Sequence, residues 1–321
     1  MAALVSVIIP VYNREDYLEE CIASVTAQSH QQMEILIVDD GSTDNSLAIC
    51  KKLAEQDSRI RLICAQHSGV SAARNLALDQ ATGEYVCFVD SDDVIHPLLL
   101  EQLVRAMTEN DASIAGANRI DVPEKHWHRV KAHMQKNAAE ASVSYQDHQQ
   151  SLEAMFFTQC PLSMMGGLML RRSLIGETRF RTDLYIGEDY YFIYENLVKG
   201  ATSCFLNAKW YYVRRHANNS SWDYSYKGFY NRFIRRKMIW ENEEKLGRQQ
   251  YANTQKNAAF GAYLMCMRKK AATNTEYRQM RLVLKQHKSA ILPALKPKTK
   301  LYFLMLMYCP VLTNLMINIK N

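Results

Sequence analysis

The sequence predicts an α/β fold in which a mostly parallel, Rossmann-like sheet is flanked by helices and followed by a basic helical C-terminal region. Two observations predict this fold. Short apolar segments alternate with segments of helical periodicity through about residue 117, which is the pattern of βαβ units. Two of the apolar segments end in adjacent carboxylates, and open α/β sheets bind ligands at the carboxyl ends of their strands.

The apolar segments predict the strands of the first half. Runs rich in Val, Ile and Leu place strands at 4–11, 34–38, 60–64, 85–89 and 113–116. Apolar stripes and start signals place helices after Asn13, after Ser42, over 71–80 and from Pro97 to Met107. Asn13 and Ser42 are the candidate N-caps of the first two helices, because their side chains can accept from orphan backbone N–H groups.

The second half is less regular. Residues 118–150 are polar, with charged and His-rich stretches, and we expect a loop or an insertion there. Short strands are expected at 167–170 and 204–206, with a helix between them that begins near Gly187. Residues 226–292 are expected to form basic helices.

Charge is distributed unevenly along the chain. Residues 1–225 carry 20 Lys and Arg against 29 Asp and Glu, a net charge of −9. Residues 226–321 carry 19 against 4, a net charge of +15, and the two parts add to the +6 of the whole chain. An acidic first part and a strongly basic end indicate two regions with different tasks.

The eight cysteines are scattered and form no CxxC pair. Several occupy apolar positions of the predicted elements, so we expect reduced core thiols rather than a disulfide or zinc framework. The N-terminus reaches its first apolar segment without a basic region, so no secretory signal is visible. Both observations favour a cytoplasmic protein.

An acidic cluster, Asp90-Ser91-Asp92-Asp93, follows directly after the apolar segment 85–89. Clustered carboxylates repel one another unless a cation compensates them. The cluster therefore suggests a hard divalent metal ion with oxygen ligands, and such an ion can hold a diphosphate.

Three further motifs each allow a structural and a functional interpretation. Asp39 and Asp40 fit an Asx turn, but two carboxylates exceed what a turn needs, and one can accept the N3–H of a uracil ring. Arg74 lies one turn into a predicted helix, where its guanidinium fits either a structural ion pair or a contact with a phosphate. Glu188 and Asp189 suit the first turn of a helix, whose macrodipole also keeps a general base ionised.

Together and in this order, the motifs resemble family 2 glycosyltransferases, inverting enzymes of the GT-A fold. The resemblance is carried by Val5–Asn13, Val38–Asp44, Gly69–Asn75 and Gly83–Asp93. It covers the first third of the chain strongly and extends loosely to about residue 222.

The resemblance implies a role for each matching residue. Asp92 and Asp90 correspond to the metal-binding DXD element for Mn²⁺ or Mg²⁺, with Asp92 as the main ligand, and Asp189 corresponds to the catalytic base. Tyr12 would stack on the base and Asp40 would hold it. The residues implied in binding the nucleotide sugar are Pro10, Tyr12, Asn13, Asp39, Asp40, Arg74, Asp90, Ser91, Arg214, Arg215 and His216.

The implied reaction is a single displacement that moves a sugar from a UDP-sugar to a hydroxyl of a glycan or lipid-linked glycan. The expected catalytic domain is 1–225, with a nucleotide-binding part at about 1–117 and an acceptor part at about 150–225. For Arg214, Arg215 and His216, structural roles stay open. Gly166-Gly167 fits either a bend or a close backbone approach to the acceptor.

The expected C-terminal region is 226–321. Its apolar stretch 301–312 follows three lysines and is shorter than the roughly 20 residues that span a bilayer. Pro310, Thr313 and Asn314 weaken a spanning helix further. The stretch therefore either packs on the enzyme or lies in the membrane interface, with lysines on anionic lipid. The second alternative favours a peripheral protein on the inner face of the cell membrane, with an acceptor carried on a polyprenyl lipid, as in capsule, O-antigen or exopolysaccharide synthesis.

Rival functions fit less well. A sugar-phosphate nucleotidyltransferase usually has a Gly-rich loop after its first strand, and residues 11–15 contain no glycine. A dinucleotide dehydrogenase would need a GxGxxG motif after a strand, and no such motif follows any predicted strand of this chain. A nucleic-acid binder is disfavoured by the acidic first part of the chain. A non-catalytic scaffold that binds nucleotide sugars stays open.

Overall fold

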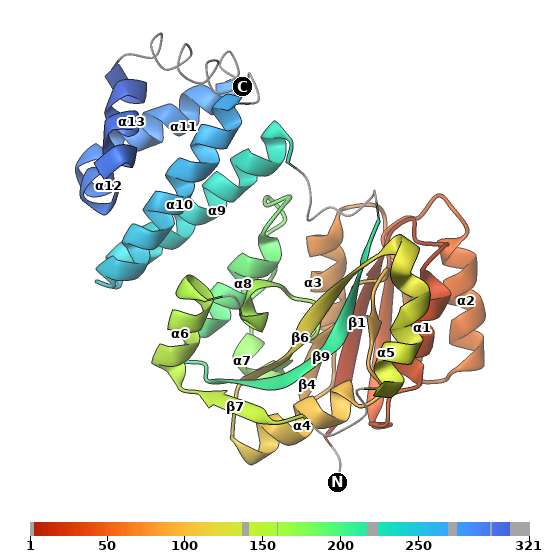
Figure 1. Ribbon diagram of the computed structural model, residues 1–321. Coiled ribbons are helices and arrows are strands. Elements are labelled where there is room, and N and C mark those ends of the chain that lie inside the picture. Colours follow the sequence, from red (N-terminus) through yellow and green to blue (C-terminus); the bar gives the residue numbers. More distant parts are fainter. Residues whose placement is uncertain are drawn as a thin grey trace. The chain divides into compact units, whose positions relative to one another are not determined.

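The computed structural model describes residues 3–136, 141–158, 160–216, 224–268, 275–295 and 297–308. The described residues form two compact units. The sheet unit lies within 1–182 and 188–219, and the helical unit lies within 183–187 and 220–321. Figure 1 draws both units and labels their helices and several of the strands.

The sheet unit is built on one mixed sheet. Nine strands lie within its described residues, eight of them in the order β3-β2-β1-β4-β8-β6-β9-β5. Their bounds are β1 Val5–Val11, β2 Met33–Asp39, β3 Ile60–Cys64, β4 Tyr85–Phe88, β5 Val94–Ile95, β6 Ile114–Pro123, β7 Val143–Gln146, β8 Leu168–Arg171 and β9 Ser203–Arg215. The pairs among β3, β2, β1 and β4 are parallel, as is β6 with β9, whereas β8 runs antiparallel to β4 and β6, and β5 and β7 run antiparallel to β9. The expected α/β fold is confirmed.

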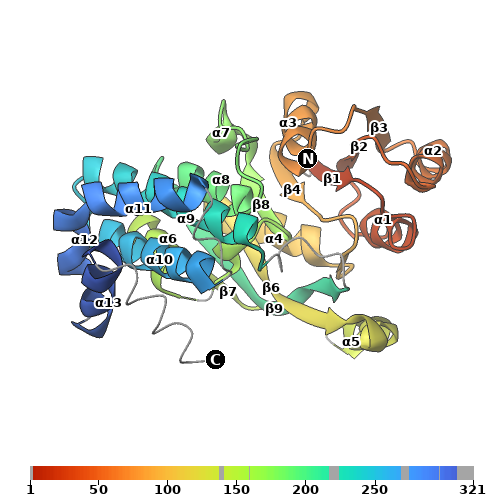
Figure 2. The same cartoon turned by 90° about the horizontal axis from the view of Figure 1, so that it is seen from above.

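Helices cover both faces of this sheet. Their bounds are α1 Leu18–Thr26, α2 Ser46–Gln56, α3 Val70–Gln80, α4 Leu99–Glu109, α5 Val130–Lys136, α6 His148–Phe157, α7 Arg172–Ile175 and α8 Glu188–Leu197. Alternate residues of β1, such as Val7 and Ile9, point into a core that also contains Ile22 of α1 and Leu103 of α4. The opposite face of the parallel strands is covered by α3 (Figure 2).

Three local expectations were wrong. The stretch 118–150 is not a loop: β6 continues to Pro123, and a 3₁₀ helix, α5, β7 and α6 follow. Its apolar residues are too widely spaced to show a period, yet Trp127 and Val130 are buried against Tyr212 of β9. Asn13 and Ser42 are not N-caps, because α1 and α2 begin several residues later and the Asn13 N–H donates to Ser42 Oγ instead (3.1 Å).

The helical unit contains the expected basic helices. They are α9 Tyr226–Lys245, α10 Gln249–Arg268, α11 Thr275–Gln286, α12 Lys288–Ala294 and α13 Pro297–Tyr308. Aromatic side chains form their core, including Phe233, Trp240, Phe260 and Phe303. No helix in the described part of the chain combines the length and apolar character needed to cross a bilayer. Pro310, Thr313 and Asn314 lie outside the described residues.

The described cysteines are all free thiols, as expected. Cys21, Cys50, Cys87, Cys204 and Cys266 are buried, whereas Cys64 is exposed and Cys160 is partly buried. Burial raises the pKa of Cys87 to about 12, so its thiol is neutral at physiological pH. These buried cysteines act as small apolar core residues.

Candidate active site

The predicted site residues of the first half meet at one edge of the sheet. Strands β2, β1 and β4 are parallel neighbours, so their carboxyl ends lie side by side. Asp39 ends β2 in register with Val11, the last residue of β1. Asp90 comes two residues after the end of β4, whose Phe88 pairs with Ile8.

Tyr12 and Asp40 form one side of this edge together with the loop before α3. Asp40 accepts hydrogen bonds from the backbone N–H groups of Ser68 (2.8 Å) and Gly69 (2.9 Å). The ring of Tyr12 stacks on His67, with centroids 4.0 Å apart, and His67 Nδ1 lies 2.9 Å from Asp40 Oδ2. Because Tyr12 and His67 are both exposed, they present flat rings at the surface beside a buried carboxylate.

Two residues shape the turn beneath these rings. Gly41 has a φ of +73°, and a Cβ there would lie 2.9 Å from the His67 backbone nitrogen, so only glycine fits. Asn13 has a φ of 52°, and its side-chain oxygen accepts from the Thr43 N–H (2.8 Å). Asn13 therefore joins the first two loops, and the structure gives its side chain a positioning contact.

Asp39 lies next to Asp40 but in different surroundings. It is 2% exposed, and its Oδ2 accepts a hydrogen bond from the Ser42 N–H (3.2 Å). Its Oδ1 is buried and has no hydrogen-bond partner among the described residues. An unsatisfied buried acceptor costs about 1–3 kcal/mol, so a donor supplied by a ligand would stabilise this position.

The acidic cluster forms a tight turn at the tip of β4, closed by the Asp93 N–H donating to the Asp90 carbonyl (3.0 Å). Asp90 pairs with Arg74 (2.9 Å), and Asp92 Oδ2 lies 2.9 Å from His216 Nε2 and 3.3 Å from Arg14 Nε.

The remaining two residues of the cluster are buried. Asp93 accepts from the Arg214 backbone N–H (2.9 Å) and hydrogen-bonds the Tyr211 hydroxyl. Ser91 is buried within the turn, and Pro10 is buried in β1. The structure thus gives each of the three aspartates a different set of partners.

These partners separate the acidities of the three aspartates. Burial opposes ionisation of Asp92, but the hydrogen bond from His216 and the charge of Arg14 outweigh it and lower its pKa. Burial raises the pKa of Asp90, with Arg74 acting against it and Asp92 reinforcing it. Burial and the charges of Asp92 and Asp90 raise the pKa of Asp93 well above its usual range. Asp92 is therefore the cluster's most firmly ionised carboxylate.

The start of α8 adds two more carboxylates. Arg74 Nη1 lies 2.9 Å from Glu188 Oε1, and Arg74 Nη2 holds Asp90. Burial and the charge of Asp189, opposed by Arg74, raise the pKa of Glu188 to about 7. Asp189 is half-buried, and its charge also raises the pKa of Asp90, which places the two carboxylates within electrostatic reach.

Two predicted arginines lie in ion pairs of their own. Arg214 is buried, pairs with Glu20 and with Glu124 (3.4 Å), and stacks over Trp127 at 3.9 Å from the ring centroid. Arg215 pairs with Asp121 (2.8 Å). The ion-pair partners described for these two guanidinium groups lie outside the acidic cluster, whereas His216 reaches Asp92.

Gly166 and Gly167 make room for Tyr211. A Cβ at Gly166 would lie 2.6 Å from the Tyr211 ring, and one at Gly167 would lie 2.7 Å from it. The Tyr211 hydroxyl in turn accepts from the Asp90 N–H (3.1 Å). The glycine pair therefore supports the acidic cluster through Tyr211.

The sequence interpretation missed His67, Arg14, Glu188 and Tyr211 as site residues. Glu188 was visible as the neighbour of Asp189, but its ion pair with Arg74 spans 114 positions. Arg14 and Tyr211 carry no local signal, because their partners Asp92 and Asp90 lie far away in the sequence, in the turn after β4.

Asp90 and Asp92 are the two carboxylates of the acidic cluster that could hold a metal ion. The described residues contain no group of three or more His, Cys, Asp or Glu side chains arranged to hold an ion by themselves. Mg²⁺ is commonly held by one or two carboxylates together with substrate phosphates and water. The donor set therefore fits an ion that binds together with a diphosphate.

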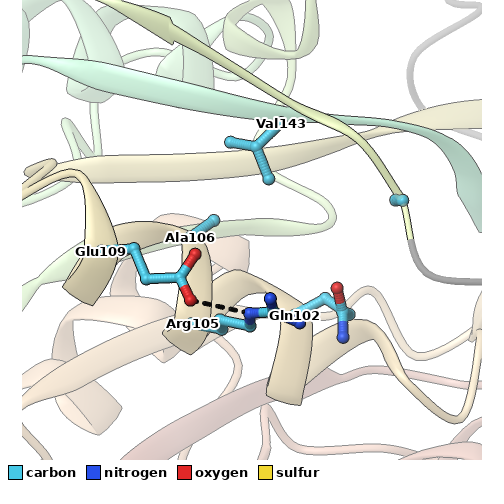
Figure 3. A pocket seen from close by; sticks show the side chains of 6 residues that line it. Gln102, Arg105, Ala106, Glu109 and Val143 are labelled. Carbon is cyan, nitrogen blue, oxygen red and sulfur yellow. Dashed lines mark hydrogen bonds and ion pairs between the residues drawn. The ribbon is translucent and has the colours of Figure 1, made fainter.

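A small pocket lies in the sheet unit away from the predicted site residues (Figure 3). Its volume is about 60 Å³, and it is lined by residues of α4 and by Ala141 and Val143. Arg105 and Glu109 form an exposed ion pair at its wall (2.8 Å). It is too small for a nucleotide and contains none of the predicted site residues.

Residues 6–178, more than half of the chain, match the family model "Glycosyl transferase family 2". The chain belongs to this family. Glycosyltransferase GlyG of Streptococcus pneumoniae serotype 4 is 40% identical over 125 residues, which are 39% of this chain and 42% of GlyG. The uncharacterized glycosyltransferase YibD of Escherichia coli K12 is 43% identical over 113 residues, 35% of this chain and 33% of YibD. The matches thus cover less than half the length of these family 2 relatives.

Solved structures also resemble this family 2 chain. The crystal structure of S. aureus TarS 1–349 superposes with a TM-score of 0.63 at 20% identity, over 98% of this chain and 88% of that one. The same TarS fragment in complex with UDP-GlcNAc gives a TM-score of 0.60 at 21% identity, over 91% and 79%. At this identity the similarity is one of fold, and it confirms the expected GT-A fold.

Proposed function

We propose that the chain is an inverting glycosyltransferase that moves a sugar from a UDP-sugar to a hydroxyl of a glycan or lipid-linked glycan. The observation that carries the proposal is the meeting of three groups in the sheet unit. The Tyr12 and Asp40 surface and the acidic cluster share one sheet edge, and Arg74 ties the cluster to Glu188 beside Asp189. The TarS structures with UDP-GlcNAc and with UDP support a UDP-sugar as donor.

The nucleoside would bind at the Tyr12 surface. An aromatic ring that is 38% exposed offers a face for stacking a base. Asp40 already accepts two backbone N–H groups, but carboxylate oxygens have further lone pairs for the N3–H of uracil. Asp39 Oδ1 is a second acceptor for a donor group of the nucleotide.

Asp92 and Asp90 would hold Mn²⁺ or Mg²⁺ together with the donor's diphosphate. The ion, when bound, would neutralise the charge that develops on the departing diphosphate. His216 and Arg14 keep Asp92 ionised, which suits a metal ligand. Asp189 would take the proton from the acceptor hydroxyl that attacks C1 of the sugar, and the second carboxylate beside it, Glu188, is held by Arg74.

We further propose an acceptor carried on a polyprenyl lipid, in capsule, O-antigen or exopolysaccharide synthesis. The strongly basic stretch 226–321 supports it, because cationic surfaces bind anionic membranes. Exposed leucines on two of its helices, Leu282 and Leu301, add apolar surface. The acceptor would then be delivered at the cytoplasmic face of the membrane.

The test of the enzymatic proposal is UDP release by full-length protein from a panel of UDP-sugars with glycan and polyprenyl-linked acceptors. We expect acceptor-dependent UDP release and a product whose anomeric configuration, read by NMR, is inverted relative to the donor. A retained configuration would contradict single displacement. Donor binding with no release for any acceptor would favour a non-catalytic scaffold.

A further inference from the structure

We propose that Arg74 and Asn75 form a clamp that positions the base-bearing helix α8 against the acidic cluster, so that Arg74 is a positioning residue and not a phosphate ligand. The clamp joins the nucleotide-binding half of the sheet unit to the half that carries Asp189. This inference deepens the proposed function and depends on it for its catalytic readout.

Arg74 is buried, and both of its terminal nitrogens hold protein carboxylates. Its side chain is 6% exposed, and its two terminal nitrogens each hold a different carboxylate, Asp90 and Glu188, at 2.9 Å. The planar guanidinium fixes the angle between its two bonds, which a lysine cannot do. Each terminal nitrogen is turned toward a protein carboxylate, and the Nε without a described partner is itself buried, so the guanidinium offers a phosphate almost no accessible surface.

Asn75 supplies the second contact of the clamp. Its Nδ2 donates to the Phe180 carbonyl (2.9 Å), and its Oδ1 accepts from the Phe180 N–H (2.7 Å). The amide side chain thus fixes the backbone of Phe180 through both its donor and its acceptor. Arg74 lies 5.3 Å from the centre of the Phe180 ring, so both clamp residues contact Phe180, Asn75 at its backbone and Arg74 at its ring.

Phe180 connects the two clamp residues to α8. Its ring stacks on Phe192 with centroids 4.0 Å apart and planes 1° apart, and it meets Phe88 of β4 edge-on at 5.5 Å. Phe192 and Glu188 are four residues apart, so they lie on one face of α8. The clamp therefore holds α8 at two successive turns, and Asp189 sits on the first of them.

Positioning of this kind acts on catalysis more than on binding. A displacement of about 1 Å at a reacting group can lower a rate by about 100-fold. Loss of the clamp should therefore lower kcat while nucleotide affinity stays nearly unchanged. A phosphate ligand would show the reverse pattern, with weaker UDP binding and an unaffected affinity for uridine.

The test uses full-length protein with Arg74→Lys, Glu188→Gln, the double variant and Asn75→Asp. Arg105→Lys, in the exposed Arg105–Glu109 pair of Figure 3, is the matched control. We expect kcat to fall 10- to 100-fold in Arg74→Lys and less in Glu188→Gln, whose amide oxygen still accepts from Arg74. The double variant should be no slower than Arg74→Lys. The Kd values for UDP and uridine without metal should change less than threefold, and the control should match wild type.

Three results would overturn the clamp. One is a tenfold or larger loss of UDP affinity in Arg74→Lys with unchanged uridine affinity and unchanged kcat. Another is a double variant whose kcat falls by the product of the two single-variant factors, because Arg74 would then not act through Glu188. The third applies if Arg74→Lys does not fold. In that case, a kcat of Asn75→Asp equal to that of wild type would contradict the clamp.

Failure of the proposed function gives a different result. Wild-type protein would then show no sugar transfer, and the clamp would be judged from thermal unfolding of the same variants. Coupled shifts in Tm between Arg74→Lys and Glu188→Gln would support it, whereas additive shifts would contradict it.

Discussion

Asp189 and Glu188 are adjacent carboxylates with different surroundings. Glu188 is buried and paired with Arg74, whereas Asp189 is half-buried. A general base must be ionised and within reach of the acceptor hydroxyl, and the partly exposed carboxylate meets the second requirement better. Because Glu188 is bound by Arg74, the arrangement favours Asp189 over Glu188 as the proposed base.

Asp189→Asn should keep donor binding and lose transfer. The amide is nearly the same size but cannot take a proton, so we expect kcat to fall by about 10²–10⁴-fold with an unchanged Kd for the UDP-sugar. Steady-state kinetics and calorimetry measure the two quantities. Turnover near the wild-type level would place the base elsewhere.

The raised pKa of Glu188 predicts that the free energy of unfolding depends on pH. Its pKa is raised to about 7 from the ordinary 4.5, so the folded protein binds this proton more tightly than the unfolded chain. The stability that it contributes is fully present below about pH 4.5 and is lost as the pH rises through 7, about 3 kcal/mol in all. Glu188→Gln cannot ionise, so its free energy of unfolding should decline less between pH 4.5 and 7. Denaturant titrations that give parallel profiles for wild type and variant would contradict this, and exposed Glu109→Gln is the control.

At the scale of elements, the strands were the most predictable part. The apolar run at 60–64 coincides with β3, and β1, β2 and β4 differ from the prediction by one residue at one or both ends. The strands β6 and β9 instead extend well beyond the predicted 113–116 and 204–206. Residues 118–150 were mispredicted because Trp127 and Val130 are isolated apolar residues in a polar stretch, and the cluster that buries them also needs Val94 and Tyr212 from distant strands.

The site could be predicted only where it follows from strand ends. Asp39, Asp40 and Asp90 through Asp93 could be grouped because parallel strands end at the same edge. Arg214 could not be interpreted this way, because its partner Glu20 is 194 positions away. The role of Asn13 depends on Thr43, 30 positions away, so its local resemblance to a cap was misleading.

The contact between β9 and the glycine pair predicts a steric effect. Gly166→Ala would place a Cβ 2.6 Å from the Tyr211 ring, so we expect a loss of about 1–3 kcal/mol in the free energy of unfolding. Gly200→Ala, with no neighbouring atom within 4 Å and a φ of +99°, is a control for backbone strain without a clash. Urea denaturation measures both. A Gly166→Ala variant as stable as wild type would show that Tyr211 can move aside.

At the scale of the whole molecule, the acidic and basic parts of the sequence predict different partners. The net charge of −9 lies in residues 1–225, where carboxylates gather around the candidate metal site. The net charge of +15 lies in residues 226–321, where α13 contains Lys298 and Lys300 and exposes Leu301 and Leu304. This distribution fits a metal-dependent site and a surface for anionic lipid.

Replacing Leu301 and Leu304 by Asp should weaken binding to anionic vesicles, because apolar contact and charge attraction are both reduced. We expect at least a tenfold loss in co-sedimentation with phosphatidylglycerol vesicles and little change with neutral ones. Leu246→Asp, at an exposed leucine that ends α9, is the control. Equal binding by the double variant and wild type would exclude α13 from a membrane contact.

The most direct measurement for the central claim is a calorimetric titration of UDP-sugars into full-length protein, with and without Mn²⁺, repeated with Asp92→Ala. The account predicts that a UDP-sugar binds wild-type protein, that Mn²⁺ tightens this binding at least tenfold, and that Asp92→Ala abolishes the Mn²⁺ effect. A UDP-sugar affinity that does not change when Mn²⁺ is added would contradict the account. So would an affinity that still increases with Mn²⁺ in Asp92→Ala.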